Sequence, residues 1–392
     1  MIPSIFGRDP PAWTALAAVN TASTLCQTVQ VGALPPLVAL TLADKGMDPT
    51  SIGLFATAPW LAILAASRFV PALLRAVGPS ASLAFSAFGS TTVIAAMAFT
   101  DDMTVFFVLN LLAGLGLIVR WVTCDTWIVT IAPVSARGRA IGTHETLMGL
   151  GIALGPLLLS LTGTSGRLPF LACAALTALA LPPLLVLRPW NRRPEPVHGR
   201  QAHQGDGRRI SRLLPVALLG AFVAGYVETS AISLLAVQVT ASGHDIVIAT
   251  LLVSAFGFGG TLLQVPVGWM ADRVGPHHGH RLCSALILGG SVAVPLLLPQ
   301  PWLAAVLLFV WGGAVGGMNT LAVLEAASAV PGPDLAAALT AVAFSYTVGG
   351  MAGPAVSGAF MQYLPAGGLM ASAGLAGCCF LLASSFLKPA TS

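Results

Sequence analysis

The sequence contains very little charge. Asp, Glu, Lys and Arg together make up 8% of its 392 residues, whereas a soluble domain carries roughly 25%. A surface in contact with water cannot be built from so few charges, so lipid must cover most of the chain. Hydrophobic residues make up 56% of the sequence, and they occur in runs of about 20 residues or more, long enough to cross a bilayer. The sequence therefore predicts an all-α membrane protein.

Sequence patterns typical of enzymes are also missing. There is no P-loop, so we expect no direct use of ATP, and there is no nucleophile elbow or dinucleotide fingerprint. The six cysteines lie in or at the ends of apolar runs without metal-ligand spacing, which favours packing roles. The net charge of +4 gives no sign of a nucleic-acid partner. We expect no enzymatic activity, metal or cofactor, and a monomer whose partners are a small-molecule substrate and the bilayer.

Twelve apolar runs predict twelve transmembrane helices. The one long polar segment, residues 188–212, lies between the sixth and seventh runs, and its Pro, Gly and Arg content is typical of a linker. We expect a six-helix bundle at 1–188, a cytoplasmic linker at 189–212 and a second bundle at 213–392. The predicted helices are 13–42, 50–74, 79–100, 103–131, 140–163, 168–188, 213–240, 246–271, 281–298, 302–326, 335–360 and 366–387.

The basic residues predict the orientation of these helices. With the N-terminus inside, only Lys45 and Arg167 fall in outer loops and only Arg120 lies within a span, so fifteen of the 18 Lys and Arg residues lie on the cytoplasmic side. Basic residues accumulate in cytoplasmic loops, so we expect both termini in the cytoplasm. We expect the protein itself in the inner membrane of the cell.

The two halves resemble each other in sequence. Gly46-x-Asp48 recurs as Gly243-x-Asp245 and Gly78-Pro79 recurs as Gly275-Pro276, both at a lag of 197 residues. Gly155-Pro156 recurs as Gly353-Pro354, and Pro133 recurs as Pro331, both at a lag of 198. A duplicated six-helix unit is typical of transporters, in which two related bundles rock about a site between them.

The loop after the eighth predicted helix carries the sequence GWMADRVG, residues 268–275. This sequence resembles the loop motif G-x-x-x-D-R-x-G of the major facilitator superfamily, and with the duplication the resemblance covers essentially the whole chain. It implies alternating-access transport, close helix packing at Gly268, and a cytoplasmic gate formed by Asp272 and Arg273. The equivalent first-half loop departs from the motif, because Arg75 replaces the acid; we expect a weaker gate there, with Arg68 or Arg75 meeting Asp125.

The fifth helix contains GIALGP, which is similar to the G-x-x-x-G-P motif of the family's proton-coupled exporters. Gly151 and Gly155 lie one turn apart and permit close helix contact, and Pro156 bends the helix. The eleventh helix repeats the pattern at Gly353 and Pro354. Two further glycines that usually follow in the exporters are missing here. The motif therefore indicates either export or small-residue packing alone.

The fourth helix contains a buried arginine at an unusual position. Asn110 occupies the place where many relatives have a midplane arginine, and Arg120 follows ten residues later. At 1.5 Å per residue, Arg120 lies roughly 25 Å from a helix start near Met103, in the cytoplasmic third of the membrane. Glu145 has a similar depth on the next helix. Either the two form a structural ion pair, or Arg120 anchors an anionic group or changes the proton affinity of Glu145.

Three other acidic residues are expected in different places. Asp125, near the inner surface, is expected in the gate with Arg75, Arg137 or Arg139, and Glu325 is expected at the membrane interface. Glu228 lies roughly 24 Å along the seventh helix by helical rise, with no basic residue nearby in sequence. A carboxyl group there can bind the coupling proton, or a polar contact across the bundle can hold it neutral.

Polar residues of the first helix indicate a cavity. Asn20, Thr24, Gln27 and Gln30 share one helical face, and amides facing lipid would be costly. This face either lines the cavity or packs against other helices through hydrogen bonds. Further cavity candidates on later helices are Tyr226, Gln264, Asn319 and Tyr346.

These features favour a secondary transporter that exports a small hydrophobic or amphipathic molecule in exchange for protons. One alternative is proton-coupled uptake of an organic anion that binds Arg120. Another is a non-transporting membrane scaffold or assembly factor with the same fold.

Overall fold

The computed structural model describes residues 12–187, 213–330, 334–365 and 367–387. Among these residues, eleven helices are long and apolar enough to cross a membrane, or twelve if one bent helix pair is counted as a single span. Each lies where the sequence predicts a span. The all-helical membrane architecture is thus confirmed, whereas the predicted linker at 189–212 lies outside the described residues.

The first six spans contain short breaks as well as continuous helices. A π-helical turn, η1, interrupts the first span, and a 3₁₀ turn, η2, interrupts the second. The elements are α1 (Ala12–Gln27), η1 (Thr28–Ala33), α2 (Leu34–Asp44), α3 (Pro49–Ala66), η2 (Ser67–Phe69), α4 (Val70–Val77), α5 (Pro79–Met97), α6 (Met103–Ile131), α7 (Arg137–Thr162), α8 (Leu168–Ala178) and α9 (Pro183–Val186).

The second six spans are more regular, apart from a bend of 43° in the eighth span. The bend separates the second and third elements of this half. The elements are α11 (Pro215–Ala241), α12 (Ile246–Leu262), α13 (Gln264–Val274), α14 (Pro276–Leu297), α15 (Pro301–Ala329), α16 (Leu335–Tyr363) and α17 (Gly368–Phe386).

The repeated sequence pairs perform the same task in both halves. Asp48 caps α3 by accepting from the Ser51 N–H at 3.0 Å, and Asp245 caps α12 by accepting from the Ile248 N–H at 2.8 Å. Such caps each stabilise a helix start by about 1 kcal/mol. Gly46 and Gly243, which precede these caps, have φ of 76° and 90°, where glycine is favoured. The repeated residues therefore mark equivalent helix starts, those of α3 and α12, in the two halves.

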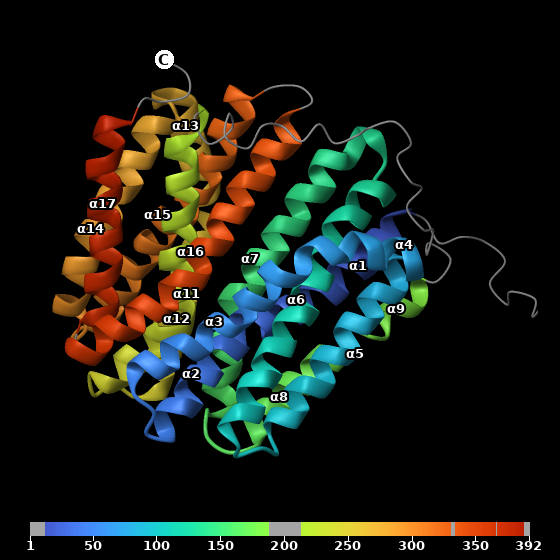
Figure 1. Ribbon diagram of the computed structural model, residues 1–392, viewed down its shortest axis with the longest axis horizontal. Coiled ribbons are helices and arrows are strands. Elements are labelled where there is room, and N and C mark those ends of the chain that lie inside the picture. The colour runs from blue at the N-terminus through green and yellow to red at the C-terminus, as the bar shows by residue number, and fades with distance from the viewer. Residues whose placement is uncertain (1–11, 188–212, 331–333, 366, 388–392) are drawn as a thin grey trace, which may run out of the picture.

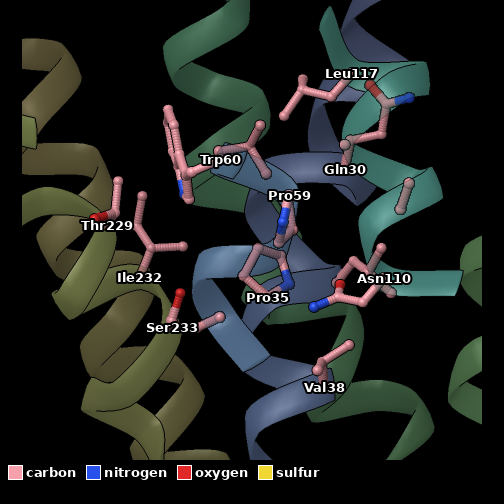
Figure 2. Close-up of a pocket in the computed structure, with 15 residues that line it drawn as sticks. Gln30, Pro35, Val38, Pro59, Trp60, Asn110, Leu117, Thr229, Ile232 and Ser233 are labelled. Carbon is pink, nitrogen blue, oxygen red and sulfur yellow. The ribbon is translucent and has the colours of Figure 1, made fainter. Parts of the chain in front are cut away.

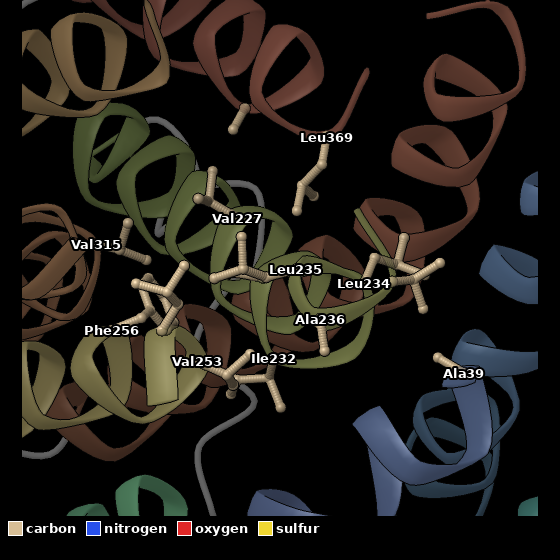
Figure 3. Close-up of a cluster of buried hydrophobic side chains, with 14 of the residues drawn as sticks. Ala39, Val227, Ile232, Leu234, Leu235, Ala236, Val253, Phe256, Val315 and Leu369 are labelled. Carbon is tan, nitrogen blue, oxygen red and sulfur yellow. The ribbon is translucent and has the colours of Figure 1, made fainter. Parts of the chain in front are cut away.

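Helix α11 forms the centre of the second half. Most of its residues are buried, and its side chains are packed on several sides (Figure 3). Val227 and Leu235 lie among residues of α12, α15 and α17, which include Phe256 and Val315. By contrast, large apolar side chains such as Phe85 stay exposed on the outer helices, as lipid contact requires.

The helices before and after the undescribed linker form two groups that diverge toward one end (Figure 1). We call this end, where Leu187 and Leu213 lie, the linker end, and the other the opposite end. Helices α2, α3 and α7 contact α11, α16 and α12 across the two groups. Near the opposite end, Ser160 and Thr250 approach to 2.6 Å between their hydroxyls. The halves are therefore closed against each other at the opposite end.

Candidate functional site

Arg120 lies on α6 inside the first half and is only 2% exposed. Its Nε donates to Gln30 Oε1 at 2.8 Å and its Nη1 to Ser23 Oγ at 3.0 Å. Its Nη2 donates to Gln27 Oε1. Gln30 is fixed in turn by donating from Nε2 to Ser90 Oγ at 2.7 Å. Neutral oxygens from α1 and η1 thus surround a buried guanidinium.

Of the two alternatives for Arg120, the structural ion pair with Glu145 is wrong for this conformation. Across the described residues, no carboxylate oxygen lies within 4.0 Å of the guanidinium, and Glu145 is exposed. Helix α7 instead turns Met148 toward Arg120, with its sulfur 3.5 Å from Nη1. Glu145 lies three residues earlier, so it projects about 60° away around the helix. A buried charge without an opposite charge is costly, which makes this arginine a functional candidate.

Asp125 pairs with a histidine and not with the arginines expected for the gate. Its Oδ1 is 3.5 Å from His144 Nε2, and His144 Nδ1 lies 2.9 Å from Asn20 Oδ1. No ion pair of Asp125 with Arg75, or with the arginines at the start of α7, occurs in the described residues. The reason is that α7 places a buried histidine between α6 and α1. His144, for which we predicted no role from the sequence, therefore links α6 and α1 at this end of the first half.

A cavity lies between the two halves (Figure 2). Gln30 and Asn110 line it from the first half, with Trp60 from α3. Thr229 and Ser233 line it from α11. Apolar side chains form most of the remaining wall, and Asn110 is fixed by donating to the Phe55 carbonyl at 2.8 Å. The cavity thus offers an apolar surface with a few polar groups, as expected of a small-molecule site.

Glu228 lies on α11 where the second half meets the first. Tyr346 of α16 donates from its hydroxyl to Glu228 Oε2 at 2.9 Å, and the Tyr346 ring lies 6.0 Å from the ring of Trp60. Glu228 lines a second cavity together with Gln264 and with Gly149 of the first half. In the described chain it has no basic partner within 4.0 Å. Tyr346 and Gln264, both predicted as cavity residues, are therefore neighbours of this carboxyl group.

The remaining cavity candidates occupy varied positions. Asn20 and Gln27 are buried and bond within the first half, as the packing alternative requires, while Gln30 both bonds Arg120 and lines the cavity. Thr24 and Asn319 are partly buried. The Tyr226 hydroxyl instead lies 2.6 Å from Ser372 Oγ inside the second half. We did not predict Trp60, Asn110, Thr229 and Ser233 as cavity residues from the sequence, because they do not belong to a periodic pattern of polar residues.

The gate residues are apart in this conformation. Asp272, Arg273 and Arg75 are exposed, and the Arg273 guanidinium lies 3.5 Å over the Trp269 ring. The expected close packing at Gly268 is wrong here, because a Cβ at that position would meet open space. The linker ends of the halves diverge, so no helix is near enough to use it.

The glycine motif acts in helix packing. A Cβ on Gly155 would overlap Gly32 of η1, and one on Gly151 would press on Gln27. Gly353 is in equally close contact with the Tyr226 carbonyl of α11. Pro156 and Pro354 lie inside α7 and α16. These glycines thus pack closely against neighbouring helices, and the contacts leave the export alternative open.

The prediction that Glu325 lies at the membrane interface is wrong, because this residue is buried in the second half and only 2% exposed. Its Oε2 lies 3.6 Å from His280 Nδ1. The two residues come from α15 and α14, which pack side by side, so their polar ends are enclosed. Among described residues, no group of three His, Cys, Asp or Glu side chains could hold a metal ion.

The chain is similar to known proteins over most of its length. The family model described as Major Facilitator Superfamily matches residues 20–217 and 217–392. The uncharacterized MFS-type transporter YfkF of Bacillus subtilis is 25% identical over 338 residues, covering 84% of this chain and 85% of that protein. YcaD of Escherichia coli, also described as an uncharacterized MFS-type transporter, is 24% identical over 345 residues, covering 86% and 87%.

Solved structures share the fold. A bacterial homologue of the human lysosomal transporter Spinster, in an inward-facing and unoccupied conformation, aligns with a TM-score of 0.75 at 15% identity, over 97% of both chains. The nucleoside transporter NupG aligns with a TM-score of 0.74 at 15% identity, over 95% of this chain and 99% of NupG. The family model matches each half of the chain. The helical architecture and the cavities between the halves agree with this assignment. The chain belongs to the Major Facilitator Superfamily, and it is a secondary transporter rather than an enzyme.

Proposed function

We propose that this transporter exports a small hydrophobic or amphipathic molecule in exchange for protons. The observation that carries the proposal is Glu228, a carboxyl group that lines a cavity between the halves without a basic partner in the described chain. Such a group gains or loses a proton as the cavity dries or fills with water. Tyr346 holds it in place, and Gln264 and Tyr346 complete its surroundings. Glu145, exposed on α7, is a second candidate for the proton.

The transport cycle rocks residues 1–188 against 213–392. With the linker end in the cytoplasm, as the basic residues favour, the described conformation faces inward and is closed outside. Closure of the linker end then brings Asp272 and Arg273 toward the first half, where Arg75 and Asp125 lie. Small residues such as Gly155 and Gly353 keep each half rigid during this motion.

The cavity supports the substrate class. Its wall combines apolar groups and the Trp60 ring with the amides of Gln30 and Asn110. An apolar molecule with a few hydrogen-bonding groups fits these surroundings, because each buried polar group of the substrate needs a partner. The substrate would bind one chain acting alone, without ATP.

Uptake of an organic anion is a second candidate, favoured by one observation. The Arg120 guanidinium has only neutral acceptors in the described chain, so an anionic ligand would supply the missing negative charge. Gln30 lies between Arg120 and the cavity and would have to move. A cationic or neutral ligand would gain nothing from this site.

Reconstitution tests both candidates. A ligand is first found by thermal stabilisation of the purified protein, since binding to the folded state raises its melting temperature. In proteoliposomes with an imposed pH gradient, the unchanged protein should move protons only with that ligand. Glu228→Gln should abolish coupled flux but retain exchange of ligand across the membrane. Asp101→Asn, which removes an exposed carboxylate bonded to Lys45, is the control and should stay coupled; full coupling in Glu228→Gln would refute the proposal.

A further inference from the structure

His144 lies between two oxygen atoms. Its Nε2 is 3.5 Å from Asp125 Oδ1 and its Nδ1 is 2.9 Å from Asn20 Oδ1. A carboxylate and an amide oxygen both accept hydrogen bonds, whereas neutral imidazole has one N–H only. A ring that carries a proton on both nitrogens can donate to Asn20 Oδ1 and present a positive charge to the Asp125 carboxylate. The geometry thus suits a positively charged histidine.

The two side chains of this contact differ in their exposure. The side chain of His144 is 4% exposed, and that of Asp125 is 45% exposed. Asp125 lies near the last turns of α6, at the linker end of the first half. A proton on the ring is therefore shielded, whereas its partner carboxylate is accessible at the surface of the protein near the end of α6.

The second half contains a histidine and a carboxylate that lack this access. His280 and Glu325 are 3.6 Å apart, with side chains 0% and 3% exposed. His280 also packs against Gly220 of α11. Both members of that pair are enclosed, whereas Asp125 of the first pair is exposed. The two halves therefore differ in the accessibility of the carboxylate.

The charged groups around His144 are few. Arg120 and Asp125 face it from α6, and Glu145 follows it on α7 within electrostatic range of Asp125. Of the other elements that pack against α7, α1, η1, α8, α12 and the short turn Val134–Ala136 contain no Asp, Glu, His, Lys or Arg, and α2 contains only Asp44, its last residue. Asp125 is thus the one carboxylate in contact with the ring among the described residues.

We propose that His144 is a proton-binding site of the transport cycle and that Asp125 passes its proton to and from water at the linker end. The inference rests on the proposed proton coupling. In the release step the Nε2–H bond breaks and an O–H bond forms at Asp125, which then gives the proton to water. The ring becomes neutral and keeps its Nδ1–H on Asn20, and the carboxylate regains its negative charge. Uptake of a proton reverses these steps.

The protonated ring also acts on the cluster around Arg120. His144 and Met148 lie one turn apart on α7, and Met148 contacts Arg120. Asn20 and Ser23 lie three residues apart on α1, so they share a face. A proton on His144 places a second positive charge beside this cluster, and its release removes that charge. Proton binding and the charge state of the Arg120 cluster are therefore linked within the first half.

Ring-labelled histidine and nuclear magnetic resonance test the site in the purified full chain. The His144 signal is identified by its loss in His144→Asn. His278→Asn, which removes an exposed histidine of the second half, is the matched control. The chemical shifts of the ring nitrogens should show the His144 ring in both its doubly and its singly protonated form as the pH is changed. Asp125→Asn should alter the protonation of the His144 ring, because the ring loses the negative charge that faces it.

Two results would overturn the proposal. One is a His144 ring that stays singly protonated over the whole pH range. The other is an Asp125→Asn variant whose ring titrates as in the unchanged protein; this variant changes an exposed side chain, so it should fold. Proton flux in proteoliposomes separates this failure from failure of the proposed function. Ligand movement without protons refutes the coupling, whereas proton flux with the same pH dependence in His144→Asn refutes only the role of His144.

Discussion

Arg120 Nε donates to Gln30 Oε1 at 2.8 Å, and the same Gln30 lines the cavity between the halves. One side chain therefore separates the buried positive charge from the space in which a ligand would bind. Gln30 belongs to the π-helical turn Thr28–Ala33. Such turns are local departures from the α-helix and are frequent at functional sites. Movement of this turn is the shortest route by which Arg120 would reach a ligand.

Replacing Gln27 by glutamate should distinguish the two transport candidates. In Gln27→Glu a carboxylate takes the place of the amide that accepts from Arg120 Nη2. The resulting hydrogen-bonded ion pair should raise the free energy of unfolding by about 1–3 kcal/mol, measured by thermal unfolding. The new carboxylate should also abolish binding of organic anions and leave binding of neutral ligands unchanged.

A second buried glutamine provides the matched control. Gln238 is 0% exposed and accepts from the Leu369 backbone N–H at 2.9 Å, with no cation at that atom. Gln238→Glu should destabilise the protein, because it buries a carboxylate without an opposite charge. Equal destabilisation in both variants would show that Arg120 does not need a negative partner.

Tyr346→Phe should release Glu228 from its one hydrogen-bond donor in the described structure. A hydrogen bond to a buried carboxyl group contributes about 1–3 kcal/mol, so the variant should lose stability and change the pH profile of proton-coupled flux. Glu228→Gln keeps an acceptor for the tyrosine but cannot bind a proton, so it should keep more stability and lose the coupling. Identical pH profiles in Tyr346→Phe and the unchanged protein would remove Tyr346 from the mechanism.

The membrane environment and the helix boundaries could be predicted from the sequence, because they depend on composition and on local chemistry. Low charge excludes a water-facing surface, and the residues that cap and end helices, such as Asp48 and Gly46, act within a few residues of their own position. The partners of Arg120 could not be predicted, because they depend on the rotation of α7. That rotation places Met148 and His144 toward α6 and leaves Glu145 exposed, although the depth estimate for Glu145 suggested contact.

The exposed pair of Lys45 and Asp101 should affect stability without affecting the conformation. Lys45 Nζ donates to Asp101 Oδ1 at 2.9 Å, and this hydrogen bond lowers the pKa of Asp101 below its ordinary value of 3.8. A lowered pKa means that the contribution is complete above that value and is lost as the pH falls through the folded-state pKa. Asp101→Asn should therefore unfold slightly more easily at neutral pH and behave as the unchanged protein in acid. A loss of stability that persists in acid would contradict this assignment.

Gly53→Ala should open the opposite end of the protein. An added Cβ would overlap the Pro354 carbonyl oxygen, where α3 meets α16 across the two halves. Overpacking of this kind costs about 1–3 kcal/mol, and separation of the halves relieves it. Gly89→Ala, on α5, is the matched control, because a Cβ there meets nothing within 4 Å. That variant should gain about 0.5–1 kcal/mol, since alanine is the better helix former.

Spin labels measure whether the halves separate. Asp44→Cys at the end of α2 and Ser242→Cys after α11 place one exposed label on each half at the opposite end, once the accessible Cys378 and Cys379 are replaced by serine. The distance between the labels should increase with Gly53→Ala and stay constant with Gly89→Ala. If the distance stays constant in both while only Gly53→Ala loses stability, α3 and α16 do not separate as rigid parts of two halves. The contact would then be a fixed part of the fold, and the halves would have to move about another interface.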